Sequence, residues 1–326
     1  MIVVTGATGF VGRYLIDRLV RDGFDVLATG RTKAGEEYYE KGGIPFSQVD
    51  IAKAETLEKL PKQGVDAVVH LAALLSIDVA QWTPEQYVMT NALGTYNILE
   101  YCRKSSVRKV VYAMTHSDVN RATEQVITEE TPRQFGSTRD ATGHGHTLPY
   151  IVAKIAGQHF IEGCVQDGTI EQGITFRFPG LRGYGSRDSR YTTVFHQFIV
   201  KAMKSQSIEI WGDHKTVRDV LYVKDAVSAI VCALGSDGVK GLYNIGSGKG
   251  LTIEDEARAI IKAFSPPDKP SQLVYRPDIE EVRKRSYVFD ISKAHRDLAW
   301  KPSYTYYEAM LDYKQEMERG YFDLER

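Results

Sequence analysis

A tyrosine and a lysine four residues apart, Tyr150 and Lys154, are well suited to acid–base chemistry. Side chains at positions i and i+4 of a helix lie on the same face, so a helix here would make them neighbours. A tyrosine titrates at about 10, so its anion must be stabilised before it can act as a base near neutrality. A shift of roughly three units requires about 4 kcal/mol, which a unit charge about 4 Å away can supply at an effective dielectric constant near 20. The pair is therefore predicted to serve as a general acid and base.

Three glycines near the start of the chain are typical of a loop that binds a dinucleotide. Gly6, Gly9 and Gly12 lie between an apolar segment, residues 2–5, and an amphipathic one, residues 10–21. Glycine permits a tight turn and a close approach to a pyrophosphate, and the following helix offers it unpaired N–H groups. A bound nicotinamide would bring a second positive charge to the phenol, and the lysine would hydrogen-bond the ribose. The predicted cofactor contacts from this loop are Gly6, Thr8, Gly9, Phe10, Val11 and Gly12.

The end of the second predicted strand indicates which dinucleotide is bound. In NAD-binding folds an acidic side chain there accepts a hydrogen bond from the ribose 2′-hydroxyl. This chain instead has Gly30 followed by Arg31 and Lys33, whose cations could neutralise a 2′-phosphate. NADP is therefore the predicted cofactor and NAD the less favoured one, with a solvent-exposed basic turn as the structural alternative. The predicted contacts at this end are Arg31, Thr32 and Lys33 at the phosphate, and Asp50 and Ile51 at the adenine.

Strands and helices that alternate along the first 180 residues must position these side chains. The predicted strands are at 2–5, 26–29, 46–49, 67–71, 110–113 and 174–178, and the predicted helices include 10–21 and 92–104. This alternation favours parallel βαβ units, so we expect an α/β fold with a Rossmann-type doubly wound parallel sheet. Residues 1–178 are expected to form the NAD(P)-binding domain, with a later strand added from about 220–223. Residues 179–326 are expected to form mainly a smaller C-terminal substrate-binding lobe, interleaved with the first region.

The composition of the 326 residues excludes several classes of protein. With 43% hydrophobic residues and a net charge of −1, the chain is globular and has no uniform field to bind nucleic acid or an anionic membrane. No apolar run approaches the roughly 20 residues that span a bilayer, and Met1 leads directly into an apolar strand, so a cytoplasmic location is expected. Three cysteines far apart in the sequence make neither a disulfide framework nor a metal site.

The order and spacing of several motifs resemble the extended short-chain dehydrogenase/reductase superfamily. Besides the glycine loop and the Tyr150/Lys154 pair, they are His70-Leu71-Ala72-Ala73 and Asn91-Ala92-Leu93-Gly94-Thr95. In the second half, residues 212–223, 243–248, 290–293 and 300–302 are similar to the nucleotide-sugar epimerase/dehydratase branch, that of UDP-galactose 4-epimerase. The resemblance spans nearly the whole chain. It implies further cofactor contacts from Leu71, Ala72, Ala73, Asn91 and Phe178.

The resemblance also implies a role for a threonine. The catalytic Ser or Thr of the superfamily follows the strand before the tyrosine, and here that residue is Thr115, whose hydroxyl would polarise the reacting oxygen beside Tyr150. Dehydratases of the branch have Asp and Glu directly after this threonine, where this chain has His116 and Ser117. Elimination of water is therefore disfavoured. The predicted catalytic residues are Thr115, Tyr150 and Lys154.

Arginines of this branch bind the diphosphate of the substrate, since a planar guanidinium can hold two phosphate oxygens. Arg218 and Arg276 are the candidates, each with a surface ion pair as the alternative. The sugar pocket departs from the family pattern, because Gly180 replaces an Asn and Arg182 replaces an aromatic residue. The predicted substrate-binding residues are Thr115, His116, Gly180, Arg182, Arg218 and Arg276.

Together these residues predict hydride transfer between the cofactor and a sugar carbon, C4, of a nucleotide-diphosphate sugar. An epimerase is slightly favoured, and an NADPH-dependent 4-ketoreductase is the alternative. Reduction of steroid or flavonoid ketones, or a non-catalytic NADP-binding regulator, is less favoured. The resemblance implies a homodimer that pairs through helices beginning near Gln86 and Tyr150. The longer loop before Tyr150 includes His144 and His146, which are interpreted as part of a solvated lid and not as metal ligands.

Overall fold

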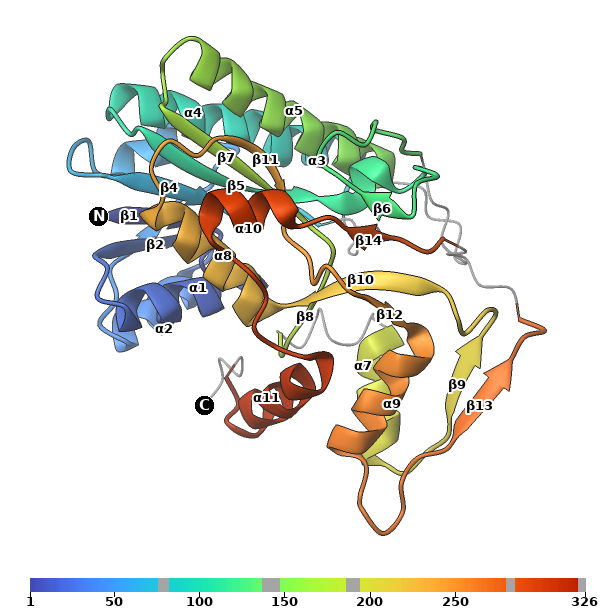
Figure 1. Ribbon diagram of the computed structural model, residues 1–326. Helices are drawn as coiled ribbons and strands as arrows, with labels where there is room; N and C mark the ends of the chain where they lie inside the picture. The colour runs from blue at the N-terminus through green and yellow to red at the C-terminus, as the bar shows by residue number, and fades with distance from the viewer. Residues whose placement is uncertain (76–81, 137–146, 186–193, 280–284, 322–326) are drawn as a thin grey trace.

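The computed structural model describes residues 1–75, 82–136, 147–185, 194–279 and 285–321 (Figure 1). Its main element is a seven-stranded sheet in the order β11-β7-β5-β4-β1-β2-β3, and its strand pairings are parallel. The strands are β1 (Ile2–Thr5), β2 (Val26–Gly30), β3 (Phe46–Gln48), β4 (Ala67–His70), β5 (Lys109–Thr115), β7 (Gln172–Phe178) and β11 (Gly241–Asn244). The order reverses between β1 and β4, and ligands of open α/β sheets bind beyond the carboxyl ends of such strands. The predicted doubly wound fold is confirmed.

Valine residues make both faces of this sheet apolar, and both faces are buried. Val3, Val68 and Val110 belong to one hydrophobic cluster, and the next residue along each of these strands belongs to the other. Because successive side chains of a strand alternate between faces, runs of valine fill both sides of the sheet. The resulting cores fix the register of the strands, and with it the positions of the residues at their carboxyl ends.

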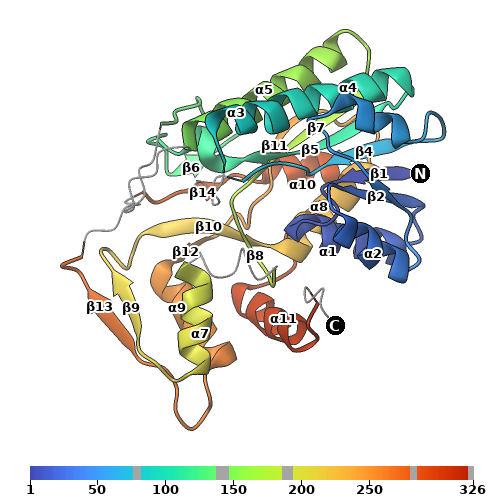
Figure 2. The same cartoon turned by 180° about the vertical axis from the view of Figure 1, so that it is seen from behind.

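Helices cover the two faces of the sheet in separate layers (Figures 1 and 2). One layer contains α3 (Pro84–Tyr87), the π-helical turn η3 (Val88–Leu93), α4 (Gly94–Lys104) and α5 (Thr147–Gln166), with the 3-10 turn η1 (Ala54–Lys59) beside α4. The other contains α1 (Phe10–Arg21), α2 (Lys33–Lys41), α8 (Val223–Gly235) and α10 (Ser292–Leu298). The segment that carries the tyrosine and lysine is therefore helical, as predicted.

The rest of the chain forms a smaller lobe at the carboxyl edge of the sheet (Figure 2). A three-stranded sheet joins β8 (Gly180–Arg182), β10 (Val217–Tyr222) and β12 (Gly250–Thr252), and a two-stranded one joins β9 (Ile208–Trp211) and β13 (Leu273–Arg276). The helices of this lobe are α7 (Val194–Met203), α9 (Ile253–Phe264) and α11 (Tyr306–Glu318). A short pair, β6 (Val126–Ile127) and β14 (Val288–Phe289), bridges the two regions beside the 3-10 turn η4 (His116–Val119).

The strand that joins the main sheet late in the chain is β11, and not the segment at about 220–223 that the sequence predicts. Residues 220–222 belong to β10, which pairs with β8 and β12 in the smaller lobe. β11 instead pairs with β7 from Gly241 to Asn244. Both segments contain a Leu-Tyr pair, Leu221-Tyr222 and Leu242-Tyr243, and the tertiary contacts decide which of them extends the sheet.

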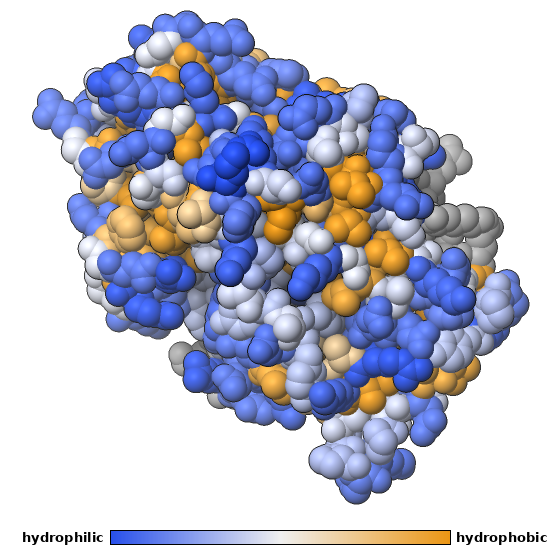
Figure 3. Space-filling view, viewed as in Figure 1, coloured by the Kyte–Doolittle hydropathy of each residue, from blue (hydrophilic) through white to orange (hydrophobic). Residues whose placement is uncertain are grey.

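The surface in Figure 3 is mainly hydrophilic, with apolar side chains interspersed between charged ones. Within the described part of the chain, no helix has both the length and the apolar character needed to cross a bilayer.

Candidate active site

The glycine loop between β1 and α1 has the shape that a pyrophosphate requires. Gly6 has a φ of +70°, and a Cβ there would lie 2.7 Å from the backbone nitrogen of Ala72. A Cβ at Gly12 would lie 2.2 Å from the carbonyl oxygen of Gly6. Gly9 is the N-cap of α1 and has no side chain to occupy the N–H groups of the first turn. The loop therefore fits a dinucleotide phosphate at the helix N-terminus.

The segment after β4 forms the opposite wall of this loop. The backbone nitrogen of Leu71 donates to the carbonyl of Thr5 at 3.2 Å, and that of Ala72 donates to the Thr5 hydroxyl at 3.3 Å. Asn91 lies in η3, and its side-chain amide both accepts from and donates to the backbone of Leu74, at 2.8 and 2.9 Å. Asn91 thus fixes the backbone that follows Ala73, and its contact with the cofactor stays a prediction.

The predicted adenine end lies beyond β2 and β3. Arg31 is exposed, with its guanidinium carbon 6.0 Å from the centre of the Trp82 ring. The Thr32 hydroxyl caps α2 by accepting from Gly35, so it is already used within the helix. Lys33 lies 3.8 Å from Glu37 in an exposed ion pair, which solvent screens and which is therefore weak. Arg31 and Lys33 both stay predicted contacts of the 2′-phosphate.

Asp50 and Ile51 lie in the turn after β3. The Asp50 carboxylate accepts from the backbone nitrogen of Ala52 at 3.2 Å and fixes the turn. Ile51 is buried against Gly94, where a Cβ would come within 2.8 Å of the isoleucine Cδ1. Asn97 of α4 also donates to the Ile51 carbonyl at 2.9 Å. These contacts hold the turn rigidly at the edge of the predicted cofactor site.

The catalytic residues predicted from the sequence come together at the carboxyl end of β5. Thr115 is the last residue of this strand, and its hydroxyl interacts with the phenol of Tyr150, which α5 presents from the first turns of the helix. Tyr150 is buried beside Leu74, Tyr87 and Ile151. The Thr115 hydroxyl also contacts the Ser117 hydroxyl at 3.1 Å. Two hydroxyls, with a third next to them, thus converge at the carboxyl end of β5.

Lys154 is held against an aromatic residue that the sequence interpretation missed. Its Nζ lies 4.0 Å from the centre of the Tyr112 ring, and the Tyr112 hydroxyl donates to the Lys154 carbonyl at 3.2 Å. His70 stacks on the same ring at 5.5 Å between centroids and bonds to the hydroxyls of Thr5 and Thr95. A cation over an aromatic face is stabilised by the ring quadrupole. The alternation of side chains along β5 was the available signal, since it places Tyr112 on the face covered by α5.

Burial dominates the titration of these groups in the protein alone. It raises the pKa of Tyr150 to about 12, although the Thr115 hydroxyl acts in the opposite direction. It lowers the pKa of Lys154 to about 7, and burial together with the Lys154 charge lowers the pKa of His70 to about 3. The sequence predicts that Lys154 lowers the pKa of Tyr150, whereas desolvation of the phenol is the largest effect here. The phenol is therefore neutral near pH 7.

The predicted substrate residues around β8 lie close to the cofactor loop. A Cβ at Gly183 would be 2.9 Å from the Phe10 ring, and the Tyr14 hydroxyl donates to the Tyr184 carbonyl at 2.9 Å. Gly180 and Arg182 pair with β10 in this strand. The Arg182 guanidinium lies 2.9 Å from the buried Glu256 carboxylate, and this ion pair joins β8 to α9. Arg182 therefore stabilises the smaller lobe, and its contact with the substrate stays a prediction.

The other predicted substrate residues occupy three separate places. The His116 ring bonds the carbonyl of Phe178 at 3.1 Å and stacks on Tyr287. Arg218 lies on β10 next to Asp219, but the buried Asp219 carboxylate accepts from the backbone of Ser247, Gly248 and Phe289. The contact of Arg218 with the substrate stays a prediction. Arg276 lies at the end of β13 and pairs with Asp278 at 3.0 Å, as its surface alternative expects.

A buried ion pair fixes the turn that follows Thr115. Asp118 of η4 and Arg177 of β7 are both almost fully buried, and their charged groups lie 2.7 Å apart. Arg177 also donates to the carbonyl of Thr128 and to the side chain of Asn244. Arg133 lies 3.4 Å from the same carboxylate. These bonds connect η4 to the main sheet and thereby hold the Thr115 hydroxyl in place.

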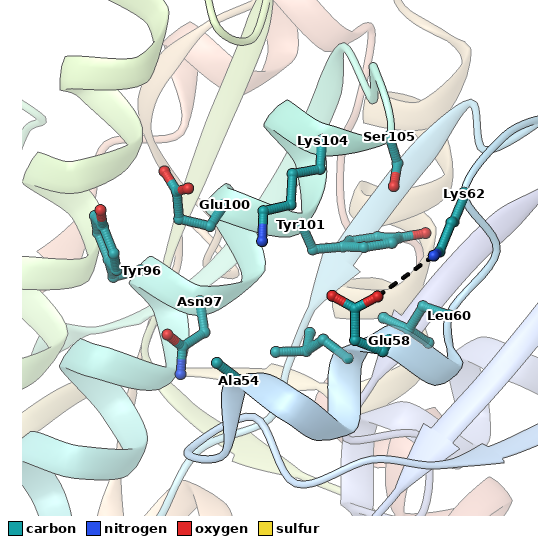
Figure 4. A pocket seen from close by; sticks show the side chains of 11 residues that line it. Ala54, Glu58, Leu60, Lys62, Tyr96, Asn97, Glu100, Tyr101, Lys104 and Ser105 are labelled. Atoms are coloured by element: carbon teal, nitrogen blue, oxygen red, sulfur yellow. Dashed lines mark ion pairs between the residues drawn. The ribbon is translucent and has the colours of Figure 1, made fainter.

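A cavity of about 490 Å³ lies on the outer side of the helical layer, between η1 and α4 (Figure 4). Glu58 and Lys62 pair at its rim, and the Tyr101 hydroxyl donates to the carbonyl of Pro61. None of the predicted catalytic or cofactor residues lines it. Within the described residues no cluster of His, Cys, Asp or Glu could hold a metal ion, and His144 and His146 lie outside the described residues.

Comparison with known proteins identifies the class. The family model described as the NAD dependent epimerase/dehydratase family matches residues 2–246. The chain belongs to this family, and the resemblance stated from the sequence motifs is confirmed.

Individual relatives are distant but match along their whole length. The UDP-glucose 4-epimerase of Mycolicibacterium smegmatis is 27% identical over 307 residues, covering 92% of this chain and 93% of that protein. The structure of UDP-glucose 4-epimerase from Thermotoga maritima with UDP-glucose has a TM-score of 0.81 at 23% identity, covering 98% of each chain. The UDP-glucose 4-epimerase of Thermus thermophilus, solved with NAD, has a TM-score of 0.76 at 24% identity and covers 98% of this chain and 99% of that one. These two structures show that the fold is shared.

Proposed function

We propose that this protein transfers a hydride between NADP and C4 of a nucleotide-diphosphate sugar. The observation that carries the proposal is the convergence of the Thr115 and Tyr150 hydroxyls, with Lys154 one helical turn away, at the carboxyl edge of the sheet beside the glycine loop. When bound, the nicotinamide supplies the hydride acceptor and donor. Membership of the epimerase/dehydratase family and the sugar nucleotide in the Thermotoga structure support the substrate class.

The residues of the chain divide the proton chemistry between them. Thr115 and Tyr150 share the oxygen on the reacting carbon, and Tyr150 gives or takes its proton. Lys154 orients the nicotinamide ribose and stabilises negative charge on the phenol, and Tyr112 holds the ammonium in place. Because burial raises the pKa of Tyr150 to about 12, the phenol stays protonated near neutral pH and so holds the proton that a reacting oxygen would take up. Proton abstraction by Tyr150 requires stabilisation of its phenolate, which the positive charges of Lys154 and of an oxidised nicotinamide would supply.

Epimerisation is favoured slightly over net reduction. It needs only the three catalytic residues, and the matching family and the named relatives include epimerases. A 4-ketoreductase is the second candidate, because Arg31 favours NADP and the cellular NADP pool is kept reduced. The measurement is absorbance at 340 nm during turnover with catalytic and with excess cofactor. A fall in absorbance mole for mole with product would contradict epimerisation, and product without net change would contradict reduction.

The preference for NADP follows from the exposed Arg31 and the missing acid at Gly30. Arg31→Ala is expected to weaken NADPH binding about tenfold and leave NADH binding unchanged, since a charge-assisted hydrogen bond contributes roughly 1.5–3 kcal/mol. Equilibrium titration of nicotinamide fluorescence measures both dissociation constants. Lys41→Ala, at the far end of α2, is the matched control and should change neither. Tighter binding of NADH than NADPH by the unmodified protein would refute the preference.

Arg218 is proposed to bind the diphosphate of the substrate. Arg218 lies in the segment 212–223 that resembles the nucleotide-sugar branch, and its planar guanidinium could hold two phosphate oxygens. We expect Arg218→Ala to weaken binding of the sugar nucleotide by more than about 1.5 kcal/mol. A thermal-shift screen of UDP-, dTDP-, GDP- and CDP-sugars identifies the ligand, and calorimetry then gives the dissociation constants. Arg296→Ala on α10 is the control. An unchanged affinity in Arg218→Ala would remove this residue from the site.

A homodimer is proposed through the outer surfaces of η3, α4 and α5. These elements expose a row of apolar side chains, namely Val88, Met89, Leu93, Tyr96, Leu148, Val152 and Phe160. Contiguous apolar surface of this kind marks an interaction site. Light scattering at micromolar concentration should give twice the chain mass of 36.6 kDa, and Phe160→Glu should give the monomer. Val274→Glu, at an exposed position of β13, should remain dimeric. A monomeric unmodified protein would contradict the proposal.

A further inference from the structure

The side chain of Thr8 fills a notch between two glycines at the adenosine end of the cofactor loop. A Cβ at Gly35 in the first turn of α2 would lie only 2.4 Å from the Thr8 Cγ2. A Cβ at Gly30, the last residue of β2, would lie 3.0 Å from the same methyl and 3.1 Å from the Thr8 hydroxyl oxygen. The threonine methyl therefore packs directly against the backbone of both glycines.

The notch is closed on its other side by an aromatic pair. Phe46 Cζ lies 3.3 Å from the Cβ position at Gly30 and 3.5 Å from that at Gly35. Phe46 stacks on the buried Tyr39 ring with 5.7 Å between centroids. The Tyr39 hydroxyl donates to the carbonyl of Ala7, next to Thr8, at 2.6 Å. Because the loop, α2 and β3 are tied together in this way, Thr8 has little room to move aside.

This arrangement matters because residue 30 holds the position at which an acidic side chain selects NAD. Such an acid would accept a hydrogen bond from the ribose 2′-hydroxyl. Any side chain at residue 30 would bring its Cβ within 3.0 Å of the Thr8 methyl and 3.3 Å of the Phe46 ring. In a close-packed interior, Thr8 or Phe46 would have to move to accommodate it.

We propose that Thr8 is a specificity-determining residue, whose side chain takes up the volume that an acid at residue 30 would require and so keeps the site open for a 2′-phosphate. The inference rests on the proposed preference for NADP. It differs from the role of Arg31, because Arg31 attracts the phosphate whereas Thr8 excludes the alternative recognition group. Gaining NAD recognition should therefore require two changes, one at residue 30 and one at residue 8.

Cofactor affinities of four proteins test this coupling, namely the unmodified chain, Thr8→Ala, Gly30→Asp and the double variant. Thr8→Ala alone should still bind NADPH more tightly than NADH, since Arg31 remains. Gly30→Asp alone should bind both cofactors at least tenfold more weakly, and adding Thr8→Ala should restore NADH binding by at least tenfold while NADPH binding stays weak. Tight NADH binding by Gly30→Asp alone would overturn the role of Thr8. Preference of the unmodified protein for NADH would instead contradict the proposed function.

Thermal unfolding without any cofactor tests the packing by itself. Gly35→Ala lies inside a helix, where alanine is normally the better residue, so a lower melting temperature would reveal the clash with Thr8. We expect Thr8→Ala in the same chain to restore the melting temperature. Gly42→Ala, at the end of α2, has no contact with Thr8 and should be unaffected by Thr8→Ala. A Gly35→Ala protein as stable as the unmodified one, or one that Thr8→Ala does not restore, would overturn the inference.

Discussion

Tyr150→Phe is expected to lower turnover at least 100-fold, about 2.7 kcal/mol of transition-state stabilisation, while the protein still folds and binds cofactor. The substitution removes only the hydroxyl that meets Thr115, and the ring keeps its packing against Tyr87 and Ile151. Because the phenol is the proton donor and acceptor in the proposed reaction, its loss acts on the chemical step. Steady-state turnover, with cofactor affinity and melting temperature measured beside it, separates this effect from misfolding.

Tyr101→Phe is the matched control for this variant. Its hydroxyl donates to the carbonyl of Pro61, on the outer side of the helical layer and away from the catalytic residues. Turnover of Tyr101→Phe should equal that of the unmodified protein. If Tyr150→Phe were also nearly as active as the unmodified protein, Tyr150 would have no part in the mechanism.

Arg177→Met is expected to lower the free energy of unfolding by about 3–5 kcal/mol, the usual effect of removing one partner of a buried ion pair. It leaves the Asp118 carboxylate buried, with Arg133 at 3.4 Å as its remaining ion-pair partner among the described residues. One oxygen of this carboxylate already has no hydrogen-bond partner among the described residues. The loss should also reduce turnover, since Asp118 anchors the turn that follows Thr115. Urea denaturation measures the stability, and Arg177→Lys should recover part of it by keeping the positive charge.

Arg108→Met is the surface counterpart of this experiment. Arg108 and Glu171 are both exposed, and solvent screens the charges of this ion pair. The free energy of unfolding of Arg108→Met should therefore differ little from that of the unmodified protein. An Arg177→Met protein that unfolds at the same urea concentration as Arg108→Met would show that the Asp118–Arg177 pair does not hold the η4 turn.

The elements around the predicted cofactor site could be predicted from the sequence, because the pattern of each lies within a few consecutive residues. The glycine spacing, the runs of valine and the four-residue interval from Tyr150 to Lys154 each lie within one element or one turn. The structure places Thr115 beside Tyr150, the position that the resemblance to the superfamily implies. The residue pattern of a strand or helix is contained in a short segment of sequence, so these elements could be predicted.

Long-range contacts could not be predicted in the same way. Tyr112 holds the ammonium of a lysine 42 residues later, and Arg182 is engaged by Glu256, 74 residues away. Neither pairing has a periodic signal in the sequence, and each depends on which elements pack together. The same reason explains why the late strand of the main sheet is β11, since the choice between two apolar segments depends on their partners.

The position of the transferred hydrogen in the product shows whether a hydride passes between the cofactor and C4 of the sugar. The protein would be loaded with NADPH that carries deuterium at both hydrogen positions of nicotinamide C4, and the sugar nucleotide found in the thermal-shift screen would be supplied as its 4-keto form. Mass spectrometry and NMR of the product should show one deuterium on C4 of the sugar for the unmodified protein, and almost none for Tyr150→Phe in the same time. Deuterium at another sugar carbon, or a product that carries no deuterium, would contradict hydride transfer at C4 by this site.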